Sequence, residues 1–451
     1  MEIVIVGGGK LGYALCRDLV IEGHEIVLID RDPIRIEALQ EELDIRCIVG
    51  NGSARDVLIE ADVPSCDVFI SVTPADETNV IAAAIAKKLG AGFSIARVRG
   101  PEYAHDLDFF HNEFGIGMLI NPDAESAADI VRAFDYPAAS SIEPFENGKV
   151  NLVTLRVRDD AQVIGKSLAE VRMLIPDILL LLIESGQQAM VPSGASVLKA
   201  GDLVQVLGPR TAIDAFSKLC GHPNRKWSSA LVIGGKRISY YLLPPLLRRG
   251  IQVKVIEVDR DTANKLAAAF PQVKVIIGDG TNQRFLQEQH LANYDVAVAL
   301  TNIDEENLMF ALFAHQQGVR KTITKVNRRE LTRLLDPRSL NTIITPHLSS
   351  TDAIIRYIRS HEKRSSSSLE GYARLSTEGA EALAFIAQET DRVTRMPIKD
   401  LTIKPGNVIG HILRGEEQIV PSGSSQIQAG DRVLIVSLNQ HIHTLDEILK
   451  T

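Results

Sequence analysis

A glycine-rich turn near the start of the chain has the residue types and spacing with the clearest chemistry. The segment GGGKLG, residues 7–12, directly follows an apolar stretch at residues 3–6 and directly precedes apolar residues at helical spacing. The pattern GxGxxG between a strand and a helix is typical of folds that bind dinucleotides. The first glycine permits the tight bend, the second lets a pyrophosphate approach the backbone, and the third lets the helix lie close to the strand. Backbone N–H groups at the helix start can hold the phosphates, so the turn predicts a nucleotide site.

An acidic residue stands where the ribose of a bound adenosine would lie. A second apolar strand is predicted over residues 25–29 and ends in Asp30, about 20 residues after the turn. Its carboxylate can accept both ribose hydroxyls and would repel a 2′-phosphate, so NAD(H) or another adenosine nucleotide is favoured over NADP. The neighbouring Arg31 weakens that preference only slightly. The alternative is a glycine turn that binds nothing.

Strands and helices then alternate as far as residue 120. Further strands are predicted over residues 46–49, 67–72, 93–98 and 117–120, and helices over residues 55–61 and 80–89. Ser53 is predicted to cap the first of these helices. Such alternation with short connections predicts a parallel, doubly wound sheet with helices on both faces. In these sheets ligands bind outside the carboxyl ends of the strands.

The residues at these strand ends are the candidate nucleotide-binding residues of the first domain. Besides Asp30 and Arg31 they are Gly7, Gly8, Gly9, Lys10, Leu11, Gly12, Asn51, Gly52, Ser53, Thr73, Pro74, Glu77 and Arg97.

The character of the sequence changes at about residue 145, and later the chain repeats itself. Short alternating apolar stretches separated by turns predict a small α+β module. Beyond it, Gly234 and Glu257 are separated by the same interval as Gly7 and Asp30. The segment TNIDEEN corresponds to the earlier TPADETN. The segment VPSG and a later Gly-Asp pair also occur twice, in the same order. We therefore predict two copies of one two-domain unit.

The predicted fold class is α/β, with two Rossmann-like doubly wound parallel-sheet domains, each followed by a small α+β domain, in the order N-C-N-C. The predicted boundaries are residues 1–122 for the first Rossmann-like domain, 123–143 for a crossover helix and linker, 144–225 for the first small domain, 226–346 for the second Rossmann-like domain, 347–368 for a second crossover helix and linker, and 369–451 for the second small domain.

The second Rossmann-like domain departs from the glycine pattern. Lys236 and Ser239 replace its second and third glycines, and a side chain at residue 236 would occupy the space where a pyrophosphate approaches. Glu257 still suits a ribose and Asp279 an adenine, so both remain candidate nucleotide-binding residues. A structural role is nonetheless favoured for this domain over nucleotide binding.

The composition excludes several classes of protein. A net charge of −8 without a basic cluster argues against a nucleic-acid binder. The four cysteines are scattered, without CxxC pairs or histidines at ligand spacing, which indicates a reducing compartment and no disulfide framework or metal site. No segment approaches 18 consecutive apolar residues, so neither a transmembrane helix nor a signal peptide is expected. A cytoplasmic protein is predicted.

This combination of motifs resembles the RCK, or KTN, family of regulators of potassium conductance. Its tandem form resembles the peripheral, TrkA-type subunits of Trk potassium-uptake systems. The resemblance rests on the GGGKLG turn with Asp30, the TPADETN and TNIDEEN loops, the segment ARVRGPEY at residues 96–103, and the VPSG and Gly-Asp pattern of both small modules, which the family calls RCK_C domains. It covers essentially the whole chain.

The resemblance implies a cytoplasmic gating ring, a homotetramer (or a dimer), docked at the inner face of the cell membrane on a K⁺-translocating subunit of the Trk type. The large domains are expected to bind NAD⁺/NADH or ATP/ADP, and the bound nucleotide to set the shape of the ring and the K⁺ flux. They are expected to pair through the helices after Asn121 and Pro346. The RCK_C domains dimerise and in some members bind a small effector such as a cyclic dinucleotide.

Two basic residues match this expectation. Lys10 stands at the family position whose side chain can reach a terminal phosphate, and Arg97 could assist. The alternatives are a solvated lysine at residue 10 and a salt bridge from Arg97 to Asp76 or Glu77. A structural or interfacial role is favoured for these two acids over direct contact with a ligand.

An NAD-dependent oxidoreductase is the alternative function. Such an enzyme needs a substrate domain that supplies a proton donor, and the small modules offer little of that kind. A redox-sensing transcription factor would need a basic recognition helix, which is missing. No enzyme activity and no catalytic residue is therefore predicted. The histidines predicted to be solvated, near domain ends or surface turns, are His222, His411, His441 and His443.

Overall fold

The chain folds into two compact units. The computed structural model describes residues 1–100, 103, 107–145, 150–186, 188–223, 226–328, 331, 341–361, 368–375, 380–438 and 442–450. Unit 1 comprises Met1–Val131 and Ser228–Ile358, and unit 2 comprises Arg132–Trp227 and Arg359–Thr451. Unit 1 holds two six-stranded sheets and unit 2 two five-stranded sheets.

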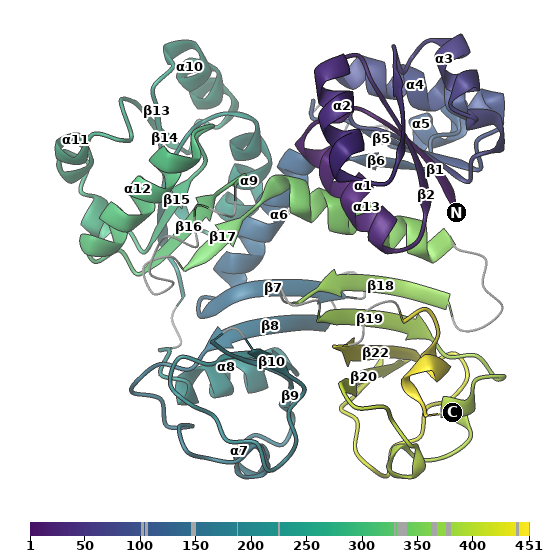
Figure 1. The fold of residues 1–451 in the computed structure, drawn as a ribbon. Coiled ribbons are helices and arrows are strands. Elements are labelled where there is room, and N and C mark those ends of the chain that lie inside the picture. Colours follow the sequence, from purple (N-terminus) through teal and green to yellow (C-terminus); the bar gives the residue numbers. More distant parts are fainter. Residues whose placement is uncertain are drawn as a thin grey trace. The chain divides into compact units, whose positions relative to one another are not determined.

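The first large domain is built on a parallel sheet with strand order β3-β2-β1-β4-β5-β6. Figure 1 draws this domain in purple to blue. Its strands are β1 Glu2–Val6, β2 Glu25–Asp30, β3 Arg46–Val49, β4 Val68–Ser71, β5 Phe93–Arg97 and β6 Met118–Ile120, and its helices are α1 Lys10–Ile21, α2 Pro33–Glu42, α3 Arg55–Glu60, α4 Asp76–Leu89, α5 Leu107–Phe114 and α6 Pro122–Asp135. The chain order reverses between β1 and β4, which pair in parallel. In doubly wound sheets such a reversal opens a crevice for ligands.

The second large domain repeats this order as β14-β13-β12-β15-β16-β17. Its strands are β12 Ser229–Ile233, β13 Gln252–Glu257, β14 Lys274–Ile277, β15 Val296–Ala299, β16 Lys321–Lys325 and β17 Thr342–Ile344, and its helices are α9 Arg237–Arg248, α10 Arg260–Ala269, α11 Gln283–Glu288, α12 Asp304–Gln316 and α13 Pro346–His361. The strands again pair in parallel throughout. The predicted duplication of a Rossmann-like domain is confirmed.

The core of the first domain explains why its central strands are apolar along their length. All of β1 after its first residue is buried, as expected for a parallel strand covered by helices on both faces. On one face Val4, Val6 and Phe69 pack against the alanines Ala82, Ala83 and Ala86 of α4. These small side chains let α4 lie close to the sheet.

Each small domain of unit 2 is built on an antiparallel five-stranded sheet, in the orders β10-β9-β11-β8-β7 and β18-β19-β22-β20-β21. The first has strands β7 Ala139–Phe145, β8 Val150–Arg156, β9 Leu179–Ser185, β10 Gln188–Met190 and β11 Leu203–Leu207 and helices α7 Leu168–Leu174 and α8 Arg210–Leu219, and the second has strands β18 Ser368–Arg374, β19 Glu381–Ile386, β20 Asn407–Arg414, β21 Glu417–Ile419 and β22 Arg432–Ser437. Phe145, Leu181 and Leu434 belong to one apolar cluster that both small domains share.

Local features of the structure differ from the sequence-based expectations. The predicted cap by Ser53 is wrong: Ala54 precedes α3, without a side-chain hydrogen bond to the helix. The Ser53 hydroxyl lies one residue too early and donates instead to Asn51 Oδ1 at 2.9 Å. Helix α4 begins at Asp76, four residues before the predicted start, and acids in a first turn favour helix formation through the helix dipole.

Strand β7 begins at Ala139, within the stretch predicted as a linker. The strand contains a proline, Pro144. Because β7 is at the edge of its sheet, Pro144 is tolerated there.

The helices after the sixth strands join the two large domains of unit 1. The Ser349 hydroxyl of α13 donates to Asp129 Oδ2 of α6 at 2.6 Å. Tyr357 of α13 packs edge-on against Phe93 of β5, with ring centroids 5.5 Å apart. The pairing of large domains through these two helices therefore occurs inside one chain.

None of the helices in the described part of the chain is long and apolar enough to cross a membrane. All four cysteines are free. Burial raises the pKa of the Cys16, Cys66 and Cys220 thiols to about 12. Among the residues that the structure describes, no cluster of three metal-ligating side chains occurs.

We expect Phe69→Ala to lower the free energy of unfolding of the first large domain by about 3–5 kcal/mol, because the fully buried ring leaves a cavity when removed. Ile81→Ala is the matched control: Ile81 lies on α4 with 52% of its surface exposed, so its loss should cost under about 0.5 kcal/mol. Urea unfolding followed by circular dichroism, with hydrogen exchange to locate the affected strands, measures both. Equal losses would contradict this core.

Candidate nucleotide site

The turn between β1 and α1 requires glycine at two positions. Gly7 has φ +105°, and a methyl group added there would lie 3.0 Å from Thr73 N. A methyl group on Gly12 would lie 1.8 Å from the Gly7 carbonyl oxygen, which no side chain can accommodate. Around Gly9, by contrast, a methyl group would meet nothing within 4 Å. The turn is therefore closely packed on the protein side and open where a ligand would approach.

The Asp30 carboxylate joins the end of β2 to this turn. Gly8 N donates to Asp30 Oδ2 at 2.6 Å, and Asp32 N donates to Oδ1 at 2.9 Å. Arg35 Nη1 also donates to both oxygens, at 3.3 and 3.1 Å. Burial raises the pKa of Asp30, but the backbone donors and Arg35 outweigh burial, so this pKa lies below its usual value. The acid is therefore ionised at neutral pH.

The loop after β3 is held by its own side chains. Asn51 Oδ1 accepts hydrogen bonds from Ser53 N at 3.2 Å and from Arg31 Nη2 at 2.5 Å. A methyl group on Gly52 would lie 2.1 Å from Val6 Cγ1, so glycine is needed for this loop to pack on the end of β1. Asp279 takes the place of Asn51 in the second domain and accepts from Thr281 N at 2.8 Å.

A buried asparagine organises the loop after β4. Asn79 is fully buried, and its Oδ1 accepts from Thr73 N at 2.8 Å and from the Ser71 hydroxyl at 2.9 Å. Its Nδ2 donates to the Thr73 carbonyl at 3.0 Å and to the Arg97 carbonyl at 2.9 Å. One side chain thus joins the ends of β4 and β5. Sequence reasoning did not identify it, although the last residue of TPADETN and TNIDEEN is the same.

The second domain repeats the arrangement. Asn307 accepts from Thr301 N at 2.9 Å and donates to the Lys325 carbonyl at 3.0 Å. Its equivalent of Ser71 is an alanine, Ala299, which supplies no hydroxyl.

Arg97 lies at the end of β5, where burial and the Arg99 charge act against the nearby acids Asp76 and Asp123. Its Nη1 donates to the Val72 carbonyl at 3.4 Å, while its buried Nε has no hydrogen-bond partner. Burial, with the nearby Arg99 charge, lowers the pKa of Arg97 to about 10. The side chain stays protonated at neutral pH, and an anion beside it would replace the solvation that it lacks.

The acids of the TPADETN loop are engaged by the protein itself. Asp76 Oδ2 accepts from the backbone N–H groups of Arg99 and Gly100, at 2.8 and 2.9 Å. Glu77 accepts a longer hydrogen bond, 3.4 Å, from the Tyr103 hydroxyl. The carbonyl of Pro74 accepts from the Arg99 guanidinium. These contacts connect the loop after β4 to the loop after β5.

The first domain therefore brings most of its candidate residues to one edge of its sheet. The glycine turn, Asp30 and Thr73 lie at the ends of β1, β2 and β4, and Lys10 is exposed at the start of α1. Leu11 is buried, so only its backbone could face a ligand. Glu257 and Asp279 lie apart from these residues, at the corresponding edge of the second sheet.

The second domain also contributes a contact behind this edge that sequence reasoning missed. The Tyr241 hydroxyl of α9 donates to the Arg99 carbonyl at 3.1 Å and accepts from Asn121 Nδ2 at 2.9 Å. Arg237 Nε lies 3.7 Å from Asp123 Oδ2. The start of α9 thus supports the loop that follows β5.

The glycine turn of the second domain keeps its connection to the acid. Gly235 N donates to Glu257 Oε2 at 2.6 Å, as Gly8 does to Asp30. Ser239 directs its hydroxyl to the Gly234 carbonyl at 2.8 Å. The substitution of serine for the third glycine is therefore accommodated by a hydrogen bond, while Lys236 immediately precedes α9.

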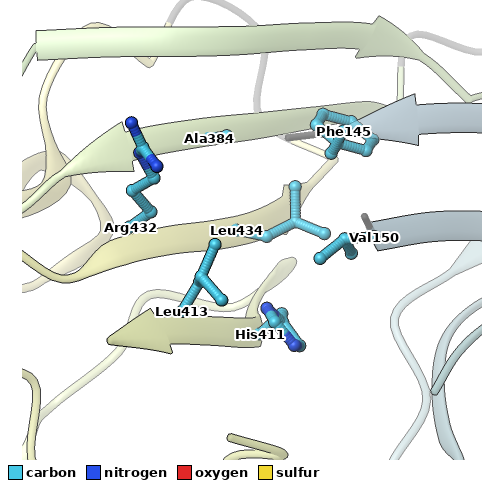
Figure 2. Close-up of a pocket in the computed structure, with 7 residues that line it drawn as sticks. All are labelled: Phe145, Val150, Ala384, His411, Leu413, Arg432 and Leu434. Carbon is cyan, nitrogen blue, oxygen red and sulfur yellow. The ribbon is translucent and has the colours of Figure 1, made fainter. Parts of the chain in front are cut away.

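A small cavity of about 10 Å³ lies in unit 2 (Figure 2). Phe145 and Val150 of the first small domain line it together with Leu434 and His411 of the second. A space of this size holds at most about one water molecule.

The predicted solvent exposure of His411 is wrong. His411 is 4% exposed in β20, and burial lowers its pKa to about 4. The register of β20 with β22 shifts between Ile409 and His411. His441 lies outside the described residues.

Each of the two parallel sheets has a glycine turn bonded to an acid, and each is followed along the chain by an antiparallel module. These features define a class of proteins with duplicated Rossmann-like domains, each with a small C-terminal partner domain. The TrkA-N domain model matches residues 3–122 and 230–346, and the TrkA-C domain model matches residues 152–221 and 384–450. The chain belongs to this TrkA-N/TrkA-C family.

The chain is similar over its full length to curated members of the family. It is 29% identical to the "Trk system potassium uptake protein TrkA homolog" of Archaeoglobus fulgidus, over 100% of both chains. It is 29% identical to the "Trk system potassium uptake protein TrkA" of Vibrio alginolyticus, over 98% of this chain and 96% of the relative. A solved structure described as "GsuK channel bound to NAD" shares the fold, with a TM-score of 0.62 and 17% identity over 99% of this chain and 78% of that one.

We expect Asn79→Ala to destabilise the first domain by about 2–4 kcal/mol, because it leaves several buried donors and acceptors without partners. Ser71→Ala is the graded control. It removes a single hydrogen bond to the same oxygen and should cost about 1 kcal/mol. Urea unfolding of both variants measures the difference, and an Asn79→Ala protein as stable as Ser71→Ala would show that the asparagine does not organise the loop.

Proposed function

We propose that this chain is a nucleotide-sensing regulatory subunit of a Trk-type potassium-uptake system. Its first large domain binds NAD⁺/NADH or ATP/ADP, and the bound nucleotide controls K⁺ flux through a membrane partner. Family membership over both domain types and the names of the full-length relatives support the biological setting.

One observation carries the nucleotide part of the proposal. In the first domain the glycine turn is open at Gly9, and the turn is bonded to an ionised acid at the end of β2. This combination offers backbone N–H groups to phosphates and a carboxylate to the ribose. The solved structures titled as bound to NAD and to ADP have the same fold, which supports the choice of ligands.

The cations near the site are assigned to the phosphates. Arg97 has an unpartnered buried Nε and Lys10 is exposed at the start of α1, so both can pair with a terminal phosphate. Asn51, Gly52 and Ser53 form the loop at the adenine side, and Thr73 lies beside the turn. Because Asp76 is taken up by backbone donors, we assign it a structural role.

Regulation requires that the two nucleotides favour different arrangements of the subunit, since a ligand shifts an equilibrium only by its differential affinity. The contacts of α9 with the loop after β5 and with the start of α6 connect the first domain to the second and offer a route for this difference. We propose a homotetrameric ring at the cytoplasmic face of the membrane, held by a K⁺-translocating subunit of the Trk type. An effector of the small domains would have to bind outside the cavity of Figure 2, which is too small for it.

Calorimetric titration of the purified chain with NAD⁺, NADH, ATP and ADP tests the site. We expect binding to the first domain that Asp30→Ala abolishes, because the ribose loses its acceptor. Glu257→Ala is the matched control, since it removes the equivalent acid of the second domain and should leave this binding intact. Absence of binding by all four nucleotides would overturn the proposal.

A flux measurement tests the regulatory role. In proteoliposomes that contain the membrane partner, K⁺ flux should respond to nucleotide with the unaltered chain and fail to respond with Asp30→Ala. A response that survives in Asp30→Ala would place the sensor elsewhere.

A further inference from the structure

The Asp30 carboxylate already has its acceptor positions filled. A carboxylate offers about four lone-pair sites for hydrogen bonds. Gly8 N and Asp32 N take one on each oxygen, and Arg35 Nη1 donates to both oxygens at 3.3 and 3.1 Å. The two backbone donors hold the acid in place. The positions left for a ribose diol are those that Arg35 occupies.

The arginine lies over the surface on which the ribose would rest. A methyl group added to Gly8 would meet Arg35 Cδ at 3.1 Å and Asp30 Oδ2 at 3.4 Å. The stem of Arg35 therefore lies close to the turn, and its guanidinium lies on the carboxylate. The side chain is 45% exposed, so it is free to move away into solvent.

Arg35 has a second carboxylate with which it can pair. Its Nη2 lies 3.4 Å from Asp32 Oδ2, and Asp32 caps the start of α2. The loss of the contact with Asp30 therefore leaves the guanidinium paired with another carboxylate on the same helix turn. Breaking the Arg35–Asp30 pair therefore costs less free energy than it would if the guanidinium were left without any partner.

The second domain serves as an internal comparison. Glu257 keeps the two backbone donors, Gly235 N at 2.6 Å and Asp259 N at 2.9 Å. At the position of Arg35 stands Thr262, whose N–H donates to Asp259 Oδ1 at 2.8 Å. Within the described residues no arginine contacts Glu257. The extra cation is a property of the first site and not of the fold.

We propose that Arg35 is a specificity-determining residue of the first nucleotide site, where it competes with the ribose 2′- and 3′-hydroxyls for Asp30. Binding exchanges the Arg35–Asp30 pair for hydrogen bonds from the diol, and Arg35 moves to Asp32. The site therefore binds adenosine nucleotides less tightly than it would if no cation were paired with Asp30. This inference rests on the nucleotide binding proposed above.

Calorimetry with two ligands tests the competition. For Arg35→Gln we expect ADP to bind about threefold to tenfold more tightly than to the unaltered chain, because a partly exposed ion pair no longer has to be broken. For 2′,3′-dideoxy-ADP, which has no hydroxyls to offer Asp30, we expect no gain. Circular dichroism confirms that the variant is folded.

The sign of the effect separates competition from general electrostatics. Loss of a cation beside an anionic ligand ordinarily weakens binding. Arg31→Gln is the matched control, since Arg31 carries the same charge next to Asp30 but donates to Asn51. We expect this variant to bind ADP equally or more weakly, and never more tightly.

Each outcome decides the matter. Weaker or unchanged ADP binding by Arg35→Gln, or an equal gain for both ligands, overturns the role of Arg35 while the nucleotide site stands. Failure of the unaltered chain to bind ADP, NADH, NAD⁺ and ATP overturns the proposed function, and the role of Arg35 with it.

Discussion

The hydrogen bond between the glycine turn and the acid at the end of the neighbouring strand is the interaction on which each large domain depends. Gly8 N bonds to Asp30 and Gly235 N to Glu257, both at 2.6 Å. In each case the bond fixes the turn against β2 or β13 and holds a carboxylate at the carboxyl-terminal edge of the sheet. A charge-assisted bond of this kind is about twice as strong as a neutral one.

The duplication shows which interactions of the unit are common to both copies and which residues differ between them. A buried asparagine, Asn79 in the first domain and Asn307 in the second, joins the ends of two strands in both domains. Asp76 and Asp304 likewise both accept backbone N–H groups from the loop after the next strand. The third glycine, by contrast, is retained only at Gly12. Framework interactions are thus common to both copies, while the space for a ligand differs.

Much of the fold could be predicted because its signals are local. The apolar strands, the strand–turn–helix context of the glycines and the order of the repeat all depend on neighbours in the chain. Other features depend on partners that are distant in sequence or on the layout of a sheet. Strand β7 contains a proline that only an edge position tolerates. His411 looked like a surface residue, but both small domains line the cavity beside it. Asn79 looked like one more polar residue of a loop.

The sequence by itself determined the class of fold, the duplication and the position of the glycine turn and its acid, because glycine conformation, strand apolarity and spacing act over a few residues. Only the tertiary structure decided what each side chain at that site contacts. Asp30 could be placed at a strand end from its position in the chain, yet its contact with Arg35, a residue of α2, is seen only in the folded structure. The sequence allowed a salt bridge between Arg97 and Asp76. In the structure, Asp76 instead accepts hydrogen bonds from the backbone N–H groups of Arg99 and Gly100. Such choices depend on distances between segments, which packing sets and local sequence does not.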